Sequence, residues 1–402
     1  MFGSKRVASV PPYLFTEINR KKEALIESGV DLIDLGVGDP DKPTPKHIIE
    51  NLFTEMSNAE NMKYPSVNGC TEFRVAVADF YQRQFNVDLD PDTEVLALIG
   101  SKEGLAHLIP SLLDPGDYLL TTDPCFTIYP MATYLANANF HAMPLTEKNN
   151  YQPNFFNIPK EILEKSKLMI LNYPNNPTSA TVDVDFFNNA VEFGKKHRIP
   201  IANDSAYNMI SFGDYKAPSI LQADGAKDIA VEIGTLSKTY NMTGWRIGYI
   251  VGNKDVIGAL RIYKGNTDTG QFTPIQKAAA FALQSDQSLI DEQSKLYEER
   301  LEMMVNTLND IGMPTKMPKA TVFVWSQIPE GFTSSQFAEM LLVEAGVLVV
   351  PGTGFGPFGE GYVRISSTVP TERIKEALKR MKELLKKDKP DSRNAYVISE
   401  GK

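Results

Sequence analysis

The sequence predicts an α/β protein with a large domain, whose mainly parallel sheet is covered by helices, and a smaller α+β domain. From about residue 95 to 255, short apolar strand-like segments alternate with segments of helical spacing, and after about residue 320 a shorter mixed section follows. Strands separated by helices form βαβ units, which build parallel sheets. Since 402 residues exceed most single domains, we expect the large domain over 45–285 and the small domain over 1–44 and 286–402.

The individual elements follow from the local apolar pattern. In the large domain, strands are predicted at 95–100, 118–123, 167–173, 199–205 and 230–236, and helices at 101–113 and 183–197. One long helix is predicted over 273–312. Beyond it, strands are predicted at 320–328, 347–350 and 362–367, with helices at 334–346 and about 371–387. Because ligands of parallel sheets bind at the carboxyl ends of the strands, functional side chains are expected just after them.

Composition limits the classes of function. Against 50 Asp and Glu the chain has 41 Lys and Arg, and the net charge of −9 argues against a broad nucleic-acid surface or an anionic membrane as partner. No apolar run approaches the roughly 18–20 residues of a membrane span, and no secretion signal is recognisable. Two cysteines fit a reducing compartment, so a cytoplasmic protein is expected. The four histidines are scattered without a metal-ligand motif, and no metal is expected.

The most informative motif is GTLSKTYNMTGWRIGYIVG at 234–252. A predicted strand ends there in hydroxyl residues, and Lys238 and then Arg246 follow. A lysine just past a strand can be shielded from water, which lowers its pKa and favours a Schiff base. Thr235, Ser237 and Arg246 offer hydroxyl and guanidinium donors to a phosphate. A lone Ser-Lys pair would more often lie in a surface loop, but the whole segment favours a site.

Three further motifs follow predicted strands. In NDSAYNMI, Asp204 can hold a protonated pyridine nitrogen and Tyr207 can donate to a phenolate oxygen, although an aspartate at such a junction often caps a helix. In LNYPNNPTSAT, a rigid proline turn presents the Asn176 amide, but most such turns are purely structural. In IGSKEGLAHLI, Ser101 and Lys102 begin a helix whose N-terminus offers backbone N–H groups to an anion, which is a weak signal alone.

In this order and spacing, the four segments resemble the class I/II aminotransferases of pyridoxal-phosphate (PLP) fold type I, from about Tyr13 to residue 387. The resemblance implies that Lys238 forms the Schiff base with PLP and moves the substrate proton, and that Asp204 binds the pyridine nitrogen. The further contacts to PLP that it implies are Tyr207 and Asn176 at the phenolic oxygen, Phe126 on the ring face, and Ser101, Lys102, Thr235, Ser237 and Arg246 at the phosphate.

The same resemblance implies a site shared between two subunits and a clamp for the substrate. Tyr64 would reach the phosphate in the neighbouring subunit of a homodimer. Arg364, in GYVRISS, would hold the substrate α-carboxylate through a bidentate pair, although an arginine at a strand end is often simply solvated. The backbone of Gly38 and the side chains of Tyr13 and Asn176 would also contact the substrate.

Within the family, the segments PPYLFTEINRKK, LGVGDPD, LSKTYNMTGWRIGY and PGTGFGPFGEGYVRISST most resemble the LL-diaminopimelate aminotransferases and their near relatives. This implies a place in lysine biosynthesis and a contact from Lys102 to a second substrate carboxylate. Phe126, Ser179 and Thr269 depart from the residues usual in that subgroup. A methionine, aspartate or broad-range amino-acid transaminase therefore stays open.

Two rival classes of protein are considered. A PLP C–S β-lyase of the same fold would use the same lysine and aspartate, but the diaminopimelate-like segments favour transfer. A regulator with an aminotransferase-like sensor domain would need an added DNA-binding segment, and none is expected because the resemblance begins near Tyr13. The predicted activity is ping-pong transfer of an amino group from an amino acid to a 2-oxo acid such as 2-oxoglutarate.

Overall fold

A seven-stranded sheet forms the larger part of the molecule, with its strands in the order β2-β8-β7-β6-β5-β3-β4. The structure, a computed structural model, describes residues 2–10 and 14–387. The strand bounds are Val95–Leu98 for β2, Tyr118–Asp123 for β3, Asn139–Pro144 for β4, Ser166–Leu171 for β5, Ile201–Asp204 for β6, Ala230–Thr235 for β7 and Gly248–Gly252 for β8. Strands β4, β3, β5, β6 and β7 pair in parallel, and β8 runs antiparallel to β7 and β2. The prediction of a mainly parallel sheet is confirmed.

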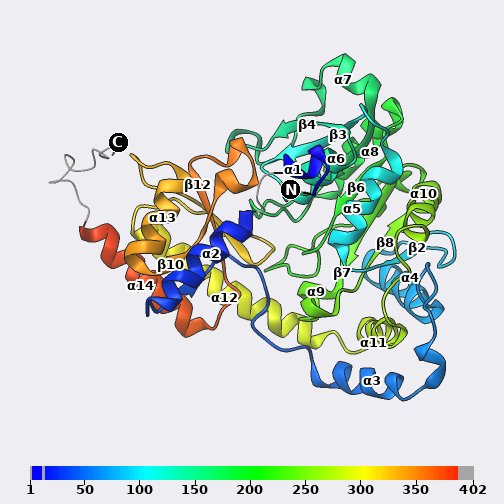
Figure 1. The fold of residues 1–402 in the computed structure, drawn as a ribbon, viewed down its shortest axis with the longest axis horizontal. Helices are drawn as coiled ribbons and strands as arrows, with labels where there is room; N and C mark the ends of the chain where they lie inside the picture. Colours follow the sequence, from blue (N-terminus) through cyan, green and yellow to red (C-terminus); the bar gives the residue numbers. More distant parts are fainter. Residues whose placement is uncertain (1, 11–13, 388–402) are drawn as a thin grey trace.

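Helices cover both faces of this sheet (Figure 1). On one face lie α3 (Lys46–Met56), α4 (Thr71–Phe85), α8 (Val184–His197) and α11 (Thr273–Gln284). On the other lie α5 (Ser101–Leu112), α6 (Ile128–Leu135) and α10 (Lys254–Gly265). All six residues of β7 are buried between the two layers. Strands covered on both sides need almost continuous apolar sequence, which explains why they could be located from the pattern alone.

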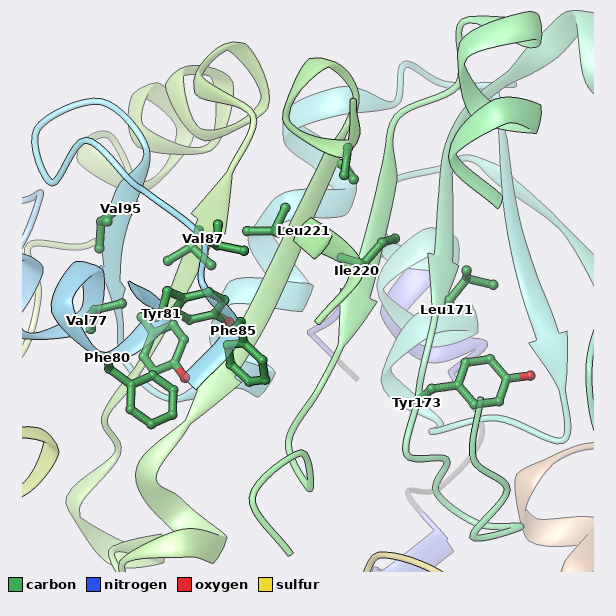
Figure 2. Close-up of a cluster of buried hydrophobic side chains, with 14 of the residues drawn as sticks. Val77, Phe80, Tyr81, Phe85, Val87, Val95, Leu171, Tyr173, Ile220 and Leu221 are labelled. Atoms are coloured by element: carbon green, nitrogen blue, oxygen red, sulfur yellow. The ribbon is translucent and has the colours of Figure 1, made fainter. Parts of the chain in front are cut away.

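Aromatic side chains of α4 form part of the core on this face of the sheet. Phe80, Tyr81 and Phe85 lie close together in Figure 2, and the Tyr81 and Phe85 ring centroids are 5.2 Å apart. The hydroxyl of the fully buried Tyr81 donates to Glu232 Oε1 at 2.8 Å. Glu232 lies on β7, so this contact satisfies a buried carboxylate and anchors the strand that leads to Lys238.

The C-terminal third forms a second, smaller group of elements that also takes in the N-terminal segment. Its antiparallel sheet has the order β11-β12-β9, and a separate parallel pair joins β1 to β10. The strand bounds are Ile33–Asp34 for β1, Phe323–Gln327 for β9, Val347–Leu348 for β10, Val350–Pro351 for β11 and Tyr362–Ser366 for β12. The helices are α2 (Leu14–Glu27), α12 (Ser288–Asp310), α13 (Ser334–Ala345) and α14 (Thr371–Lys387). The exact limits of the two domains stay a prediction.

The single helix expected over 273–312 is wrong, because two helices occupy that stretch. Residue Ser285 has an extended backbone with ψ 171°, which ends α11. The Asp286 carboxylate then accepts hydrogen bonds from the backbone N–H and the hydroxyl of Ser288 at 3.1 and 2.7 Å, and α12 begins there. As a result α11 packs against α4 and α3, whereas α12 runs into the C-terminal group (Figure 1).

Three short helices complete the chain, with the bounds Lys5–Ala8 for α1, Lys160–Lys165 for α7 and Leu236–Thr239 for α9. The α1 segment rests on α6, where Arg6 Nη1 donates to the carbonyl of Leu135 at 2.6 Å. Within the described ranges, no helix has both the length and the apolar character needed to cross a membrane.

Candidate active site

A cavity of about 390 Å³ lies at the carboxyl ends of the central strands, where the C-terminal group meets the sheet. The sequence-predicted residues that line it are Gly38, Ser101, Lys102, Phe126, Asn176, Asp204, Tyr207, Thr235, Ser237, Lys238, Arg246 and Arg364. Two predicted residues are not among them. Tyr64 is 94% exposed on the surface, and Tyr13 lies outside the described residues.

Lys238 lies on α9, directly after β7, and its side chain reaches into the cavity. Its Nζ donates to the backbone carbonyl of Gly38 at 2.6 Å. Burial lowers the pKa of Lys238 to about 8; the Asp39 carboxylate opposes this effect, and Arg364 and Arg246 add to it. About a tenth of the amine is then neutral at pH 7, far more than for an ordinary lysine, and the neutral form is the one that acts as a nucleophile or a proton acceptor.

Asp204 ends β6 and presents one carboxylate oxygen to the cavity. The Tyr129 hydroxyl donates to Asp204 Oδ2 at 2.8 Å, whereas the buried Oδ1 accepts no hydrogen bond of normal geometry. Burial raises the pKa of Asp204 to about 6, against the opposing effects of Tyr129 and the Ala206 backbone N–H. A buried acceptor in this state is suited to a protonated ring nitrogen, so the residue fits the pyridine of PLP.

An anion cup lies at the start of α5. Gly100 has φ 76° and precedes Ser101 at the N-terminus of this twelve-residue helix. A Cβ on Gly100 would lie 2.3 Å from Arg246 Nη2, so only glycine lets the guanidinium approach the helix start this closely. The Thr235 hydroxyl donates to Ser237 Oγ at 2.9 Å beside it. Helix N–H groups, hydroxyls and a guanidinium together fit the phosphate of PLP.

A second cationic group lies across the cavity. The buried Arg364, on β12, donates from Nη1 to Asn176 Oδ1 at 2.7 Å and from Nη2 to the Gly36 carbonyl at 2.6 Å. Its guanidinium lies over the Phe323 and Phe355 rings, 4.1 and 4.7 Å from their centroids. These contacts fix the plane of the guanidinium, which suits bidentate recognition of a carboxylate.

Two aromatic residues and one amide complete the wall. The Tyr207 ring packs edge-on against Phe323 with centroids 5.5 Å apart, and burial raises its pKa. Phe126 contacts Tyr129 in the same edge-on way at 6.0 Å. Asn172 donates to the backbone carbonyl of Asp204 at 2.6 Å and accepts from the backbone N–H of residue 176 at 2.8 Å, so it ties two neighbouring strand ends together.

Several of these residues escaped the sequence reasoning. Tyr129 stands three positions after Phe126 in DPCFTIYP, and Asn172 stands inside the quoted LNYPNNPTSAT motif. Phe323 lies within a predicted strand, where an apolar residue indicates the hydrophobic core and not a binding site. An available signal was the helical spacing that places Tyr129 on the same side as a predicted cofactor contact.

One polar cluster lies outside the cavity. Among the described residues, Glu103, His107 and Asp268 form one group whose atoms are close enough to hold a metal. However, the buried Lys264 ammonium is 2.6 Å from Asp268 Oδ1 and 3.3 Å from Glu103 Oε1, and His107 Nδ1 is 2.6 Å from Glu103. The ammonium already supplies the positive charge, so the cluster is an ion-pair network that joins α5 to the C-terminal end of α10.

A lysine, an aspartate and an anion cup around one cavity of a doubly covered parallel sheet define a cofactor-dependent α/β enzyme. The family model for aminotransferase class I and II matches residues 30–381, so the chain belongs to this family. It is a PLP-dependent transaminase of fold type I, and the resemblance found in the sequence is confirmed.

Relatives and solved structures agree over nearly the whole chain. An LL-diaminopimelate aminotransferase from Aquifex aeolicus is 49% identical over 381 residues, covering 95% of this chain and 98% of the relative. One from Moorella thermoacetica is 46% identical, covering 96% and 99%. A substrate-bound BacF structure from Bacillus subtilis has a TM-score of 0.93 at 37% identity, covering 96% and 98%. An aspartate aminotransferase structure from Thermotoga maritima has a TM-score of 0.88 at 30% identity, covering 96% and 100%.

Proposed function

We propose that this enzyme transfers an amino group from LL-diaminopimelate to a 2-oxo acid such as 2-oxoglutarate, as a step of lysine biosynthesis. The observation that carries the proposal is that Arg364 and Lys102 both line the cavity, in addition to Arg246 of the anion cup. Diaminopimelate and 2-oxoglutarate each carry two carboxylates, so each can place one on Arg364 and the other towards Lys102. The names of relatives 44–49% identical to the chain support the same substrate.

PLP is the cofactor that we assign to this cavity. When bound, it supplies an electron sink for the pair of electrons left when the substrate loses its Cα proton. Lys238 would link to it covalently, and Asp204 would accept a hydrogen bond from its ring nitrogen. The remaining contacts would come from Phe126 on the ring and from Tyr207 and Asn176 at the phenolic oxygen. At the phosphate they would come from Thr235, Ser237 and Arg246 and from the backbone N–H groups of Ser101 and Lys102, which lets the Lys102 ammonium contact the substrate.

Lys238 also serves as the base that moves the substrate proton. With its pKa lowered to about 8 by burial, the amine can accept the Cα proton near neutral pH and later return it. Arg364 holds the α-carboxylate and thereby orients the Cα–H bond towards the lysine. Gly38 allows close approach of the backbone, because a Cβ there would lie 2.4 Å from Phe323 Cζ.

A homodimer with shared sites is part of the proposal. Exposed apolar side chains gather on α3, on α11 and around the 3₁₀ turn Ala59–Met62, where the His47 and Phe281 rings meet at 5.9 Å. The exposed residues are Phe53, Met56, Met62, Tyr64 and Phe281. Such a patch is typical of a subunit interface, and Tyr64 within it could then serve the neighbouring cavity. The two free cysteines, Cys70 and Cys125, suit a cytoplasmic location.

A general amino-acid transaminase is the second candidate. Phe126 stands on the cavity wall where a tyrosine would be usual for the diaminopimelate enzymes, and an aspartate aminotransferase is among the structural neighbours. The same residues would perform the chemistry, and only the group that meets Lys102 would differ.

The half-reaction separates these candidates. Purified, PLP-loaded enzyme is mixed with one amino acid at a time, and the loss of visible cofactor absorbance is followed for LL-diaminopimelate, glutamate, aspartate, methionine, alanine and an aromatic amino acid. We expect rapid conversion with diaminopimelate and glutamate alone. Conversion by methionine, aspartate or aromatic amino acids with diaminopimelate inert would move the enzyme to the general transaminases.

A further inference from the structure

Arg300, on α12, lies near the cavity without lining it. Several hydrogen bonds hold its guanidinium in place. Its guanidinium forms a bidentate pair with Asp41, both contacts being 2.9 Å. It also donates to the Ser367 carbonyl at 3.0 Å and to Thr371 Oγ1 at 3.1 Å. The two charged side chains are only 3% and 10% exposed. Burial raises the pKa of Asp41, but the hydrogen bonds from Arg300 lower it overall, so the pair stays charged.

The two segments that Arg300 joins are those that form the substrate side of the cavity. Residues 36–41 include Gly36, whose carbonyl accepts from Arg364, and Gly38, whose carbonyl accepts from Lys238. Residues 365–368 follow Arg364 through the end of β12 and just beyond it, and the Thr368 hydroxyl donates to the carbonyl of residue 37 at 2.9 Å. When these two segments are held against each other, the carbonyl groups that accept from Lys238 and Arg364 are held in place as well.

The α12 helix also bonds α9, the short helix that carries Lys238. Gln293 Nε2 donates to the backbone carbonyl of Lys238 at 2.8 Å. Gln293 and Arg300 are seven residues apart in the sequence, about two helical turns, and so lie on the same side of α12. Through these two side chains, α12 thus bonds both α9, which carries Lys238, and residues 36–41, which carry the carbonyl group that accepts from Lys238.

We propose that Asp41 and Arg300 form a positioning pair for transamination, which fixes residues 36–41 so that Lys238 and Arg364 keep the spacing that the substrate Cα–H and carboxylate require. The inference rests on the proposed roles of those two residues. Neither Asp41 nor Arg300 touches substrate or cofactor; both act through the carbonyls of Gly36 and Gly38. An error of about 1 Å in that spacing is enough to cost about a hundredfold in rate.

The chain supplies a matched control on the same N-terminal segment. Asp31 pairs with Arg373 at 2.6 Å and also with Arg380, but its side chain is 61% exposed, it precedes β1 and it makes no contact with the cavity. Both aspartates bond arginines of the C-terminal group. Only the Asp41 pair leads to the acceptors of Lys238 and Arg364. Loss of the buried pair will also cost more stability than loss of the exposed one, so the Lys238 labelling profile, and not stability, distinguishes the two substitutions.

The test compares Asp41→Asn, Arg300→Lys and Asp31→Asn. In PLP-loaded enzyme we expect the first two to lower kcat/KM about tenfold to a hundredfold, through kcat as well as through KM for the amino donor, and Asp31→Asn to leave it within about twofold. In the cofactor-free proteins, the pH dependence of Lys238 labelling by a small amine reagent is measured by mass spectrometry. Water admitted by the loosened segment should raise the lysine pKa from about 8 towards the ordinary value near 10.4 in the first two variants only.

The outcomes separate the possible failures. If Asp41→Asn and Arg300→Lys match Asp31→Asn in KM and in the Lys238 labelling profile, the positioning role is wrong. If Asp41→Asn does not fold, Arg300→Lys decides, because it keeps the charge while losing the bidentate geometry. If no amino acid is transaminated even by the wild type, the proposed function fails, whereas the labelling profile still tests the pair.

Discussion

The two ends of the cavity are built in different ways. At the cofactor end, Asp204, Ser101 and Lys238 come from the ends of β6 and β7 and the start of α5, all within the seven-stranded sheet and its helices. At the substrate end, Arg364 comes from β12 and bonds the carbonyl of Gly36 and the amide of Asn176. The cofactor end thus depends on one sheet, whereas the substrate end exists only when the C-terminal group is correctly seated on that sheet.

Removing the lysine should have the largest effect. Lys238→Ala should lower turnover by at least about a thousandfold, because in the proposed function the same amine links the cofactor and moves the proton. PLP should still bind without a covalent link, since Asp204 and the anion cup are unchanged. Steady-state rates and the visible spectrum after dialysis measure the two effects. Near-normal turnover would remove the lysine from its assigned role.

A change at the substrate end should leave the cofactor end intact. Arg364→Lys keeps the charge but loses the planar fork that bonds Asn176 and Gly36, so KM for the amino donor should rise about tenfold to a hundredfold. PLP affinity, measured by equilibrium dialysis, should change less than about threefold. An equal loss of both would mean that the two ends are not independent.

The smallest effect is a pH-dependent difference in stability at the cofactor end. Burial raises the Asp204 pKa to about 6, whereas the unfolded value is near 3.9. The folded cofactor-free protein therefore binds this proton more tightly than the unfolded chain, and stability is lost as pH rises from about 4 to 6.

The substitution Asp204→Asn should remove this loss of folding stability with rising pH. Relative to wild type, the cofactor-free variant should gain stability across this window, on the order of 1–3 kcal/mol by pH 7, while its PLP affinity falls. Thermal unfolding from pH 4 to 7 measures the gain. A difference that is constant with pH would show that burial does not control this carboxyl group.

The cofactor end was also the easier end to predict from the sequence. Its residues follow apolar strands within short motifs, and the strands are recognisable because both faces are buried. Tyr129 was missed, because its hydrogen bond to Asp204 joins α6 to β6 only in the folded chain. Tyr64 is exposed at the surface of the single chain, so its predicted contact with the cavity of a second subunit stays a prediction.

The residues that hold the substrate end in place could not be predicted from the sequence, for a different reason. Asp41 and Arg300 are 259 residues apart, and neither stands in a motif that suggests a partner. The break at Ser285 between α11 and α12 was equally hidden, because Ser, Asp and Gln are all tolerated inside helices and only the capping geometry ends one.

The pairing of β1 with β10 has a consequence for how the chain is made. Ile33 meets Val347 in this two-stranded sheet, so β1 completes its structure only with a segment that is synthesised 314 residues later. At roughly 5–20 residues per second, its partner strand appears only some 15–60 s later. During synthesis the seven-stranded sheet can therefore fold first, while the N-terminal segment waits unpaired and open to chaperones and proteases.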